Sequence, residues 1–235
     1  YRKNIGKQKK TRTLCALKKN MSIRRTNKKS QKEWLKKNSH LKILDLGCSC
    51  SNYWPEANHF SDIDDFSQYF KEKNLAFTKI EPNKKLPFKD KEFDYVILSH
   101  VMEHVPNLIE FKKEIERIAK AGYIELPTKL NDNIVFGCDE EVLGHKWWFE
   151  FDDENHILLF TKKVDAIEKF LSVGQVWKFQ KYYEDSFILQ FYWKDNINLK
   201  EREPFKVEKK ITFLSLIKKY FSKKIRMLLS AVKNN

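Results

Sequence analysis

Short apolar runs alternate with amphipathic segments through the middle of the chain. The runs at 42–46, 58–62, 93–98 and 123–127 predict buried strands, and the segment 65–74 predicts a helix between two of them. Strands that alternate with helices in this way are typical of an open, mostly parallel sheet with helices on both faces. We therefore expect an α/β fold.

The pattern changes after these strands. An irregular, aromatic-rich insert covers residues 128–161, and a helix is predicted over Val164–Ser172. Two β-rich runs, Val176–Tyr182 and Phe187–Trp193, are separated by a short polar turn and predict an antiparallel hairpin.

Both ends of the chain predict helices. Thr13–Asn20 and Gln31–Asn38 are periodic at the start, and Trp34 and Leu35 of the second segment are expected to face inward. The tail from Ile211 to Leu229 repeats apolar residues at three- and four-residue spacing with lysines between them, so it predicts one basic amphipathic helix. We expect this helix to dock on the domain or on another domain of the same polypeptide, while peripheral membrane contact is also allowed. The predicted units are a basic helical extension over residues 1–38, a body over 39–204 and the C-terminal helix over 205–235.

Charge separates the ends from the body. Residues 1–38 hold 15 lysines and arginines against the single acid Glu33, and residues 205–235 hold 9 against Glu208. The residues between them hold 22 basic and 30 acidic side chains, a net charge of −8. Basic ends suit attraction to nucleic acid, to an anionic membrane or to a phosphate-bearing donor, and solvated helices are the plain alternative.

The composition bounds the class of protein. A chain of 235 residues with 41% hydrophobic and 14% aromatic residues is sufficient for one globular domain. It has no uninterrupted apolar run long enough to span a membrane and no secretory signal pattern. The four cysteines are too few and too scattered for a disulfide framework, which fits a reducing, cytoplasmic compartment. Because the first residue is Tyr1, we expect a piece of a longer polypeptide.

One loop carries a resemblance to a known family. The heptapeptide DLGCSCS at residues 45–51 resembles the D-x-G-x-G-x-G loop of class I S-adenosylmethionine-dependent methyltransferases, with Ser49 and Ser51 where the second and third glycines usually stand. Asp62 follows Asp45 by 17 residues, at the predicted tip of the next strand, where a carboxylate suits the ribose hydroxyls. The neighbouring acids Asp64 and Asp65 are candidate helix caps.

Further segments extend the resemblance to residues 41–127. Residues 86–98 are similar to the family's "LPF…FDxV" stretch, 99–105 to its "vleHv" element and 123–127 to its fifth strand. The resemblance implies a Rossmann-like, seven-stranded, mostly parallel sheet that ends in an antiparallel hairpin. It implies S-adenosyl-L-methionine as cofactor, with S-adenosyl-L-homocysteine as product, and leaves a cofactor-binding pseudoenzyme open because two loop glycines are replaced. The implied cofactor-binding residues are Asp45, Gly47, Ser49, Asp62, Glu81, Asn83 and Ser99.

The segment after the fourth strand of the family pattern points to the acceptor. Methyltransferases of nucleobase or amide nitrogen usually carry an Asn/Asp-Pro-Pro-aromatic run here, and this chain has none, which favours an oxygen acceptor. His100, Glu103 and His104 share one face if a helix begins here, and they resemble the E-x-x-E-H metal cluster of ubiquinone-type O-methyltransferases. A divalent metal at these three residues is allowed, but we favour a histidine base without metal, from His100, His104 or His145.

The insert indicates the substrate. Trp147, Trp148 and Asp152 combine aromatic faces with a carboxylate, as a sugar site requires, although such aromatics also close cores. Residues 144–163 resemble a segment of methyltransferases found among glycan-assembly enzymes of the type 11, ubiquinone-methyltransferase-like group. We therefore predict methylation of a sugar hydroxyl of a glycan, such as one on rhamnose, within a longer glycan-assembly polypeptide. The alternative is a nucleic-acid methyltransferase that uses its basic ends.

Overall fold

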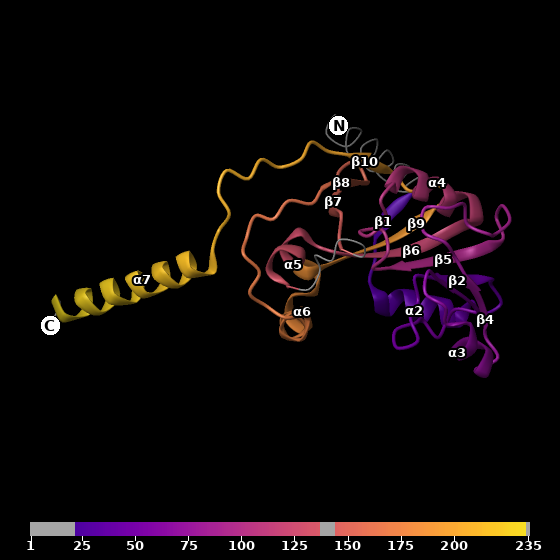
Figure 1. The fold of residues 1–235 in the computed structure, drawn as a ribbon, viewed down its shortest axis with the longest axis horizontal. Helices are drawn as coiled ribbons and strands as arrows, with labels where there is room; N and C mark the ends of the chain where they lie inside the picture. Colours follow the sequence, from indigo (N-terminus) through magenta and orange to yellow (C-terminus); the bar gives the residue numbers. More distant parts are fainter. Residues whose placement is uncertain (1–21, 137–143, 234–235) are drawn as a thin grey trace, which may run out of the picture.

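A seven-stranded sheet forms the body of the protein (Figure 1). The computed structural model describes residues 22–136 and 144–233. The strand order is β1-β9-β6-β5-β2-β3-β4; neighbouring strands from β4 to β6 run parallel, and β9 is antiparallel to both β6 and β1. The strands are β1 (Ile23–Arg25), β2 (Ile43–Leu46), β3 (His59–Asp62), β4 (Ala76–Lys79), β5 (Phe93–Ser99), β6 (Ala119–Pro127) and β9 (Ile188–Lys194). The predicted α/β fold class is confirmed.

Helices cover both faces of this sheet because alternate residues of its central strands point to opposite sides. Tyr95 of β5 packs in the cluster that holds Leu35 of α2 (Lys28–Lys37) and Phe70 of α3 (Ser67–Glu72). Its neighbour Val96 packs in the cluster that holds Ile115 of α4 (Leu108–Ile118).

A second, three-stranded sheet occupies the insert. β7 (Trp147–Asp152) and β8 (Ile157–Lys162) form an antiparallel hairpin, and β10 (Leu199–Glu201) pairs parallel with β8. A short helix, α5 (Lys129–Ile134), precedes the hairpin. Phe149 and Phe160 are buried in the same core cluster as β5 and β6. The described part of the insert, residues 128–136 and 144–161, therefore forms regular structure, and aromatic residues in it build part of the core.

The predicted terminal hairpin is wrong. Residues 176–182 belong to helix α6 (Val173–Phe187), and no helix forms over Val164–Ser172. The side chain of Gln175 accepts a hydrogen bond of 2.8 Å from the backbone N–H of Ser172, which caps the first turn. The aromatic and β-branched residues of α6 suggested a strand, but capping and the burial of Val176 against α5 decide the structure.

The antiparallel partner of β9 comes from the start of the chain. Ile23 pairs with Trp193, so β1 closes the edge of the main sheet inside the segment predicted as a helical extension. The helix predicted over Gln31–Asn38 is confirmed as α2, whose first turn is capped by the side chain of Asn27. The helix predicted over 13–20 lies outside the described residues.

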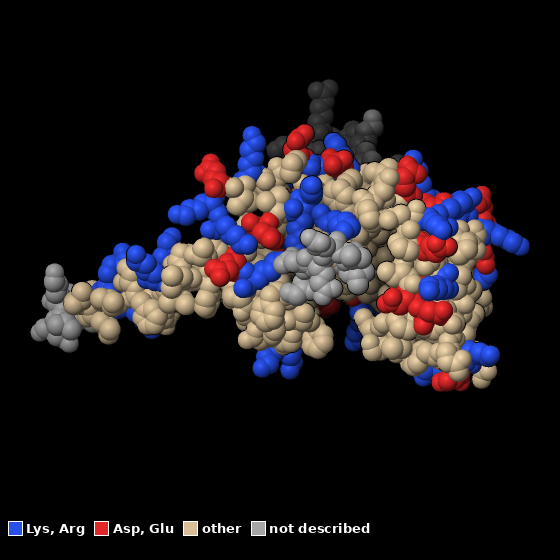
Figure 2. Space-filling model, viewed as in Figure 1, with Lys and Arg blue, Asp and Glu red and all other residues tan. Residues whose placement is uncertain are grey.

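The predicted C-terminal helix is confirmed as α7 (Phe213–Lys233). Phe213 stacks on Phe170 at a centroid distance of 5.6 Å, and its N–H donates to Glu168 at 2.8 Å. Beyond this contact α7 extends away from the body, so the expected docking on the domain does not occur (Figure 1). In Figure 2 its lysines and arginine lie mostly along one edge of the helix. Among the described residues, no helix has the length and apolar character needed to cross a membrane.

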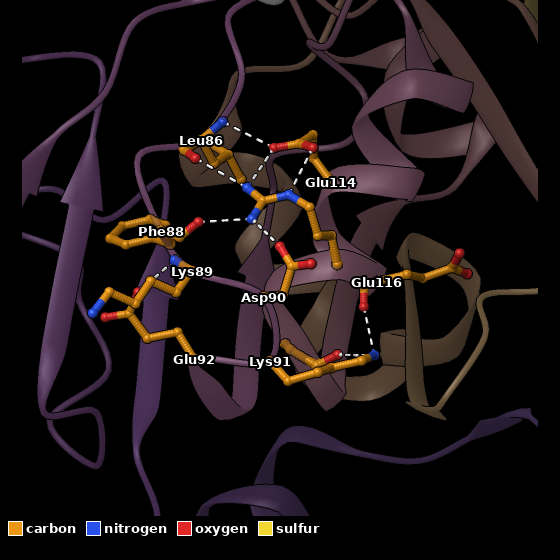
Figure 3. A network of polar contacts seen from close by, with 10 residues as sticks. Leu86, Phe88, Lys89, Asp90, Lys91, Glu92, Glu114 and Glu116 are labelled. Carbon is orange, nitrogen blue, oxygen red and sulfur yellow. Dashed lines mark hydrogen bonds and ion pairs between the residues drawn. The ribbon is translucent and has the colours of Figure 1, made fainter.

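The segment that resembles "LPF…FDxV" is held by one arginine. Arg117 of α4 donates to the carbonyl oxygens of Leu86 at 3.0 Å and Phe88 at 2.7 Å and pairs with Asp90 at 2.9 Å (Figure 3). Glu114 accepts from the guanidinium at 2.8 Å and from the N–H of Leu86 at 3.0 Å. These contacts anchor the loop before β5, at the end of the strand opposite the candidate site, so the segment has a structural role.

Candidate active site

The carboxyl ends of four parallel strands bring the predicted residues to one edge of the sheet. Leu46 pairs with Ser61 of β3 and Leu98 of β5, so Gly47, Asp62 and Ser99 follow in adjacent positions. Loops at this edge are where ligands bind in open α/β sheets.

Gly47 allows the loop after β2 to approach the segment that follows β5. Its φ of +82° is a conformation that glycine adopts readily. A Cβ atom at this position would lie 2.5 Å from Cγ2 of Val101, so no larger residue fits without movement. Its N–H donates to the carbonyl of Ser61 at 2.7 Å. Where the family pattern has glycines, Ser49 accepts from the N–H of Asn52 at 3.0 Å and stabilises the turn.

Asp45 anchors the far end of this loop. Its carboxylate is 3% exposed and accepts a hydrogen bond of 2.7 Å from the N–H of Trp54. Burial raises the pKa of Asp45 to about 7, although the Trp54 hydrogen bond and the charge of Lys28 act in the opposite direction. Asp45 was predicted to bind the cofactor. In the structure its carboxylate holds the end of the loop through the N–H of Trp54.

This raised pKa predicts that Asp45→Asn stabilises the protein at alkaline pH. Because the folded state binds the proton more tightly than the unfolded state, stability is lost as pH rises from about 4 through about 7. The free energy of unfolding of the variant should exceed that of the parent by roughly 2–4 kcal/mol at pH 8 and by little at pH 4. Urea unfolding at both pH values measures this, with exposed Asp64→Asn as the control. An equal loss of stability at both pH values contradicts the prediction.

Asp62 ends β3 beside Gly47. Its Oδ1 accepts from the N–H of Asp64 at 2.9 Å, and the backbone N–H of Ile63 also interacts with the carboxylate. The side chain is half-buried, and burial raises its pKa. Asp65 is engaged just before α3 instead, where it accepts from the N–H of Ser67 at 3.0 Å, although the N-cap position itself is Phe66. The carboxylate available to a ligand at this strand tip is therefore that of Asp62.

Glu81 and Asn83 lie in the exposed turn after β4. The N–H of Ile80 donates to the carbonyl of Asp62 at 2.9 Å, which places this turn beside the tip of β3. Glu81 forms an ion pair with Lys84, and Asn83 has a φ of +59°.

The helix predicted to begin at His100 is wrong, since residues 100–105 form turns and α4 begins at Leu108. His100 has a φ of +58°, and its Nδ1 lies 3.1 Å from Oε1 of Glu103. Its Nε2 lies 3.6 Å from Oε1 of Glu125. Burial alone lowers the pKa of His100, but the hydrogen bond and charge of Glu103 and the charge of Glu125 raise it on balance. Local turns, rather than helical spacing, bring His100 and Glu103 together.

Glu125 of β6 is a site residue that the motif comparison missed. It accepts hydrogen bonds from Ser99 at 2.9 Å, from Lys28 at 2.9 Å and from Tyr123 at 2.6 Å. Burial tends to raise its pKa, but Lys28 and Tyr123 lower it on balance. Lys28 belongs to α2, so the N-terminal segment supplies a cation to the site. An acid inside the buried run of β6 was the available signal in the sequence.

The insert is fastened to the turn over residues 100–105. The N–H of Lys146 donates to the carbonyl of Glu103 at 2.7 Å, and the indole N–H of Trp147 donates to the carbonyl of Val105 at 2.7 Å. The His104 and His145 rings meet edge to face, with centroids 4.6 Å apart. This turn therefore contacts the Gly47 loop through Val101 and the insert through its other residues.

His145 is held by a buried carboxylate. Its Nδ1 forms a hydrogen bond with Oδ1 of Asp132, whose side chain is 2% exposed. Asp132 lies in α5 and was not predicted as a site residue. A carboxylate on one imidazole nitrogen orients the ring and leaves the other nitrogen for a reacting group.

The structure supports the predicted sugar-binding residues unevenly. Trp148 is 4% exposed, so its ring offers no open face, because β7 packs it into the core. Asp152 ends β7 at the opposite end from His145, where it accepts from the N–H groups of Glu154 and Asn155. Trp147 is half-buried with its N–H engaged, and it is the one of the three that lies beside the turn over residues 100–105.

Comparison with known families decides the class of this site. A family model described as a methyltransferase domain matches residues 17–164, more than half of the chain. The chain belongs to this family of methyltransferase domains. Membership confirms the predicted methyltransferase enzyme class, while the glycan subtype stays a prediction.

Solved structures similar to this methyltransferase domain are distant. YcgJ from Bacillus subtilis is 15% identical over 45% of this chain and 52% of that chain, with a TM-score of 0.33. An S-adenosylmethionine-dependent methyltransferase from Aquifex aeolicus is 13% identical over 69% and 88%, with a TM-score of 0.36. A putative Haloferax volcanii methyltransferase, in complex with the Trm112 activator, is 12% identical over 66% and 82%, with a TM-score of 0.40. This chain thus spans about half of YcgJ. No curated protein matches it.

A candidate cation site lies between the turn and the insert of this methyltransferase domain. Glu103, His104 and His145 each offer one ligand atom, and these atoms lie within 4.8 Å of one another. The predicted set had His100 in place of His145. One carboxylate and two imidazoles suit Zn²⁺ or Fe²⁺ better than Mg²⁺.

Proposed function

We propose that this methyltransferase domain transfers a methyl group from S-adenosylmethionine to a hydroxyl of a sugar in a glycan. The arrangement that supports this best is His145, oriented by buried Asp132 and packed against the turn that contacts Gly47. A hydroxyl acceptor must lose its proton, and an imidazole beside the turn over residues 100–105 suits that task. The sugar we expect is a deoxyhexose such as rhamnose, and the parent protein is a glycan-assembly polypeptide.

The residues at the sheet edge fit a nucleoside cofactor. Because Gly47 has no Cβ, the loop after β2 packs directly against Val101, and Asp62 brings a half-buried carboxylate to the adjacent strand tip. Asp62 would accept the ribose hydroxyls, and the turn that holds Glu81 and Asn83 would lie toward the base. When bound, S-adenosylmethionine supplies a sulfonium-activated methyl group that an acceptor oxygen displaces in line.

The side chains of this chain supply the proton chemistry. The contact between Asp132 and Nδ1 of His145 supports the tautomer that carries its proton on Nδ1, and in that tautomer Nε2 would accept the hydroxyl proton. Asp132 stabilises the imidazolium that forms. His100, with its raised pKa and two carboxylates, is the second candidate base and is placed to orient the acceptor. His104 packs against His145 and limits its movement.

Acceptor specificity tests the proposal. The 235-residue protein is incubated with methyl-tritiated S-adenosylmethionine and either a rhamnose-containing oligosaccharide or RNA. We expect label in the oligosaccharide as an alkali-stable ether and none in RNA. Label in RNA at enzymatic rates contradicts the sugar assignment. Binding of S-adenosylhomocysteine without label in any acceptor, across a wider sugar panel, favours a pseudoenzyme.

Chelation separates a histidine base from a metal mechanism. A cation held by Glu103, His104 and His145 would lower the pKa of a bound hydroxyl. We expect turnover after EDTA treatment and dialysis to remain within about twofold of the untreated enzyme, because the Asp132–His145 pair needs no cation. Loss of turnover that Zn²⁺, Mn²⁺ or Mg²⁺ restores contradicts the base mechanism.

A further inference from the structure

Helix α7 exposes a large apolar surface that the body does not cover. We call it the apolar face, and it consists of Leu214, Tyr220, Phe221, Ile225, Leu228 and Leu229. All six side chains are at least 55% exposed. Contiguous exposed apolar surface of this kind marks a site of interaction.

The opposite side of α7 is cationic. At 100° per residue, Lys219, Lys223 and Arg226 point away from Leu214 and Phe221. The helix contains no acidic residue from its first position to its last. It therefore combines an apolar side with an all-basic polar side, which is the composition of helices that lie in the plane of a membrane surface.

We propose that α7 binds the surface of an anionic lipid bilayer. The apolar face enters the boundary between headgroups and acyl chains, and Lys219, Lys223 and Arg226 contact the anionic headgroups. Lys218 lies between Ile225 and Leu229 around the helix, and Lys224 lies between Tyr220 and Leu228. Their long stems can extend the ammonium groups from the apolar side up to the same headgroups.

The charges and the apolar face of α7 argue against a second copy of this helix or a nucleic acid as its partner. A second copy of α7 would bring two all-basic helices together, which repel each other. A nucleic acid would pair with the cations but leave the apolar face in water. The body, with its net charge of −8 over residues 39–204, is repelled by an anionic bilayer, so attachment goes through a basic end of the chain, and α7 adds an exposed apolar face to its basic charge. The exposed connection from Arg202 to Thr212 leaves α7 room to lie on a surface.

Vesicle partitioning of the full 235-residue protein tests this inference independently of the sugar acceptor. Co-sedimentation is measured with vesicles of phosphatidylglycerol and phosphatidylcholine and with phosphatidylcholine alone. We expect binding to the anionic vesicles that weakens with salt. Lys219→Glu with Lys223→Glu, and separately Phe221→Ser with Leu228→Ser, should each lower the partition coefficient by about tenfold or more.

Matched controls keep the result specific. Lys71→Glu with Lys73→Glu makes the same change of charge in α3 and at its C-cap, and Ile109→Ser removes an exposed apolar side chain from α4; both should bind within about twofold of the parent. Because the substituted α7 residues are exposed, circular dichroism should show an unchanged fold. Four outcomes would each overturn the inference. They are unaltered vesicle binding by the α7 variants, equal binding to neutral vesicles, binding of RNA in place of vesicles, and a dimer that Phe221→Ser dissociates.

Discussion

Replacing His145 with alanine is expected to lower kcat by about 10²-fold or more, while the dissociation constant for S-adenosylhomocysteine stays unchanged. His145 contacts the turn over residues 100–105 rather than the Gly47 loop, so its loss should affect proton transfer and not cofactor binding. Asp132→Asn should also lower kcat, because an amide can favour the wrong imidazole tautomer. Turnover at saturating cofactor and calorimetric binding of S-adenosylhomocysteine measure the two effects.

Three other histidine variants complete this experiment. His40→Ala, outside the site, should retain full activity. If His145→Ala is fully active and His100→Ala loses activity, the base is His100 and our assignment is wrong. The pH profile then identifies it: a base must be deprotonated, and because the pKa of His100 is raised, the rate would still increase above about pH 6.5. His104→Ala and His104→Asn together test the role of His104. If His104 only packs against His145, kcat should recover in part in His104→Asn relative to His104→Ala.

Asp62→Ala is expected to weaken cofactor binding by one to two decades. Hydrogen bonds between a carboxylate and ribose hydroxyls contribute about 1.5–3 kcal/mol, and alanine removes both the charge and the acceptors. Since burial raises the pKa of Asp62, the affinity of the parent should also fall as pH decreases through that pKa. Calorimetry with S-adenosylhomocysteine at two pH values measures both effects.

Neighbouring carboxylates provide the matched controls for Asp62. Asp62→Asn keeps an acceptor for the N–H of Asp64, so it should preserve the turn and lose only part of the affinity. Asp64→Ala and Asp65→Ala remove nearby charges of the same sign, and we expect the affinity to change less than twofold. An unchanged affinity in Asp62→Ala with a loss in Asp64→Ala moves the ribose contact to Asp64.

The central parallel strands were predictable because each is a short apolar run buried on both faces. Leu44 and Val96, for example, are fully buried in strands whose positions the pattern indicated. The strand predicted over residues 176–182 is wrong because the β-branched and aromatic side chains there favour strands locally. The helix forms instead because of its cap and its contact with α5. Strand β1 could not be inferred, since Ile23–Arg25 is too short to show a period and depends on pairing with β9.

The sheet edge that carries Gly47 and Asp62 was predictable, whereas the contacts of His100 and His145 were not. Gly47 and Asp62 lie together because parallel strands end at a common edge, which spacing along the chain reveals. No helical face forms at His100, because its backbone is left-handed and its N–H donates to the carbonyl of Glu125. These two features turn the chain before α4 begins. Asp132 and Lys28 reach the site through tertiary contacts, and no local pattern in either segment indicates them.

The pairing of β1 with β9 has a consequence for folding on the ribosome. The backbone N–H of Lys28 donates to the side chain of Gln190, 162 positions later in the chain. During synthesis, β1 must therefore wait until β9 has left the ribosome, and until then β6 exposes an unpaired edge that other chains can join. Pairing of such high contact order is slow. The edge of β6 therefore stays unprotected in the nascent chain until β9 has joined it.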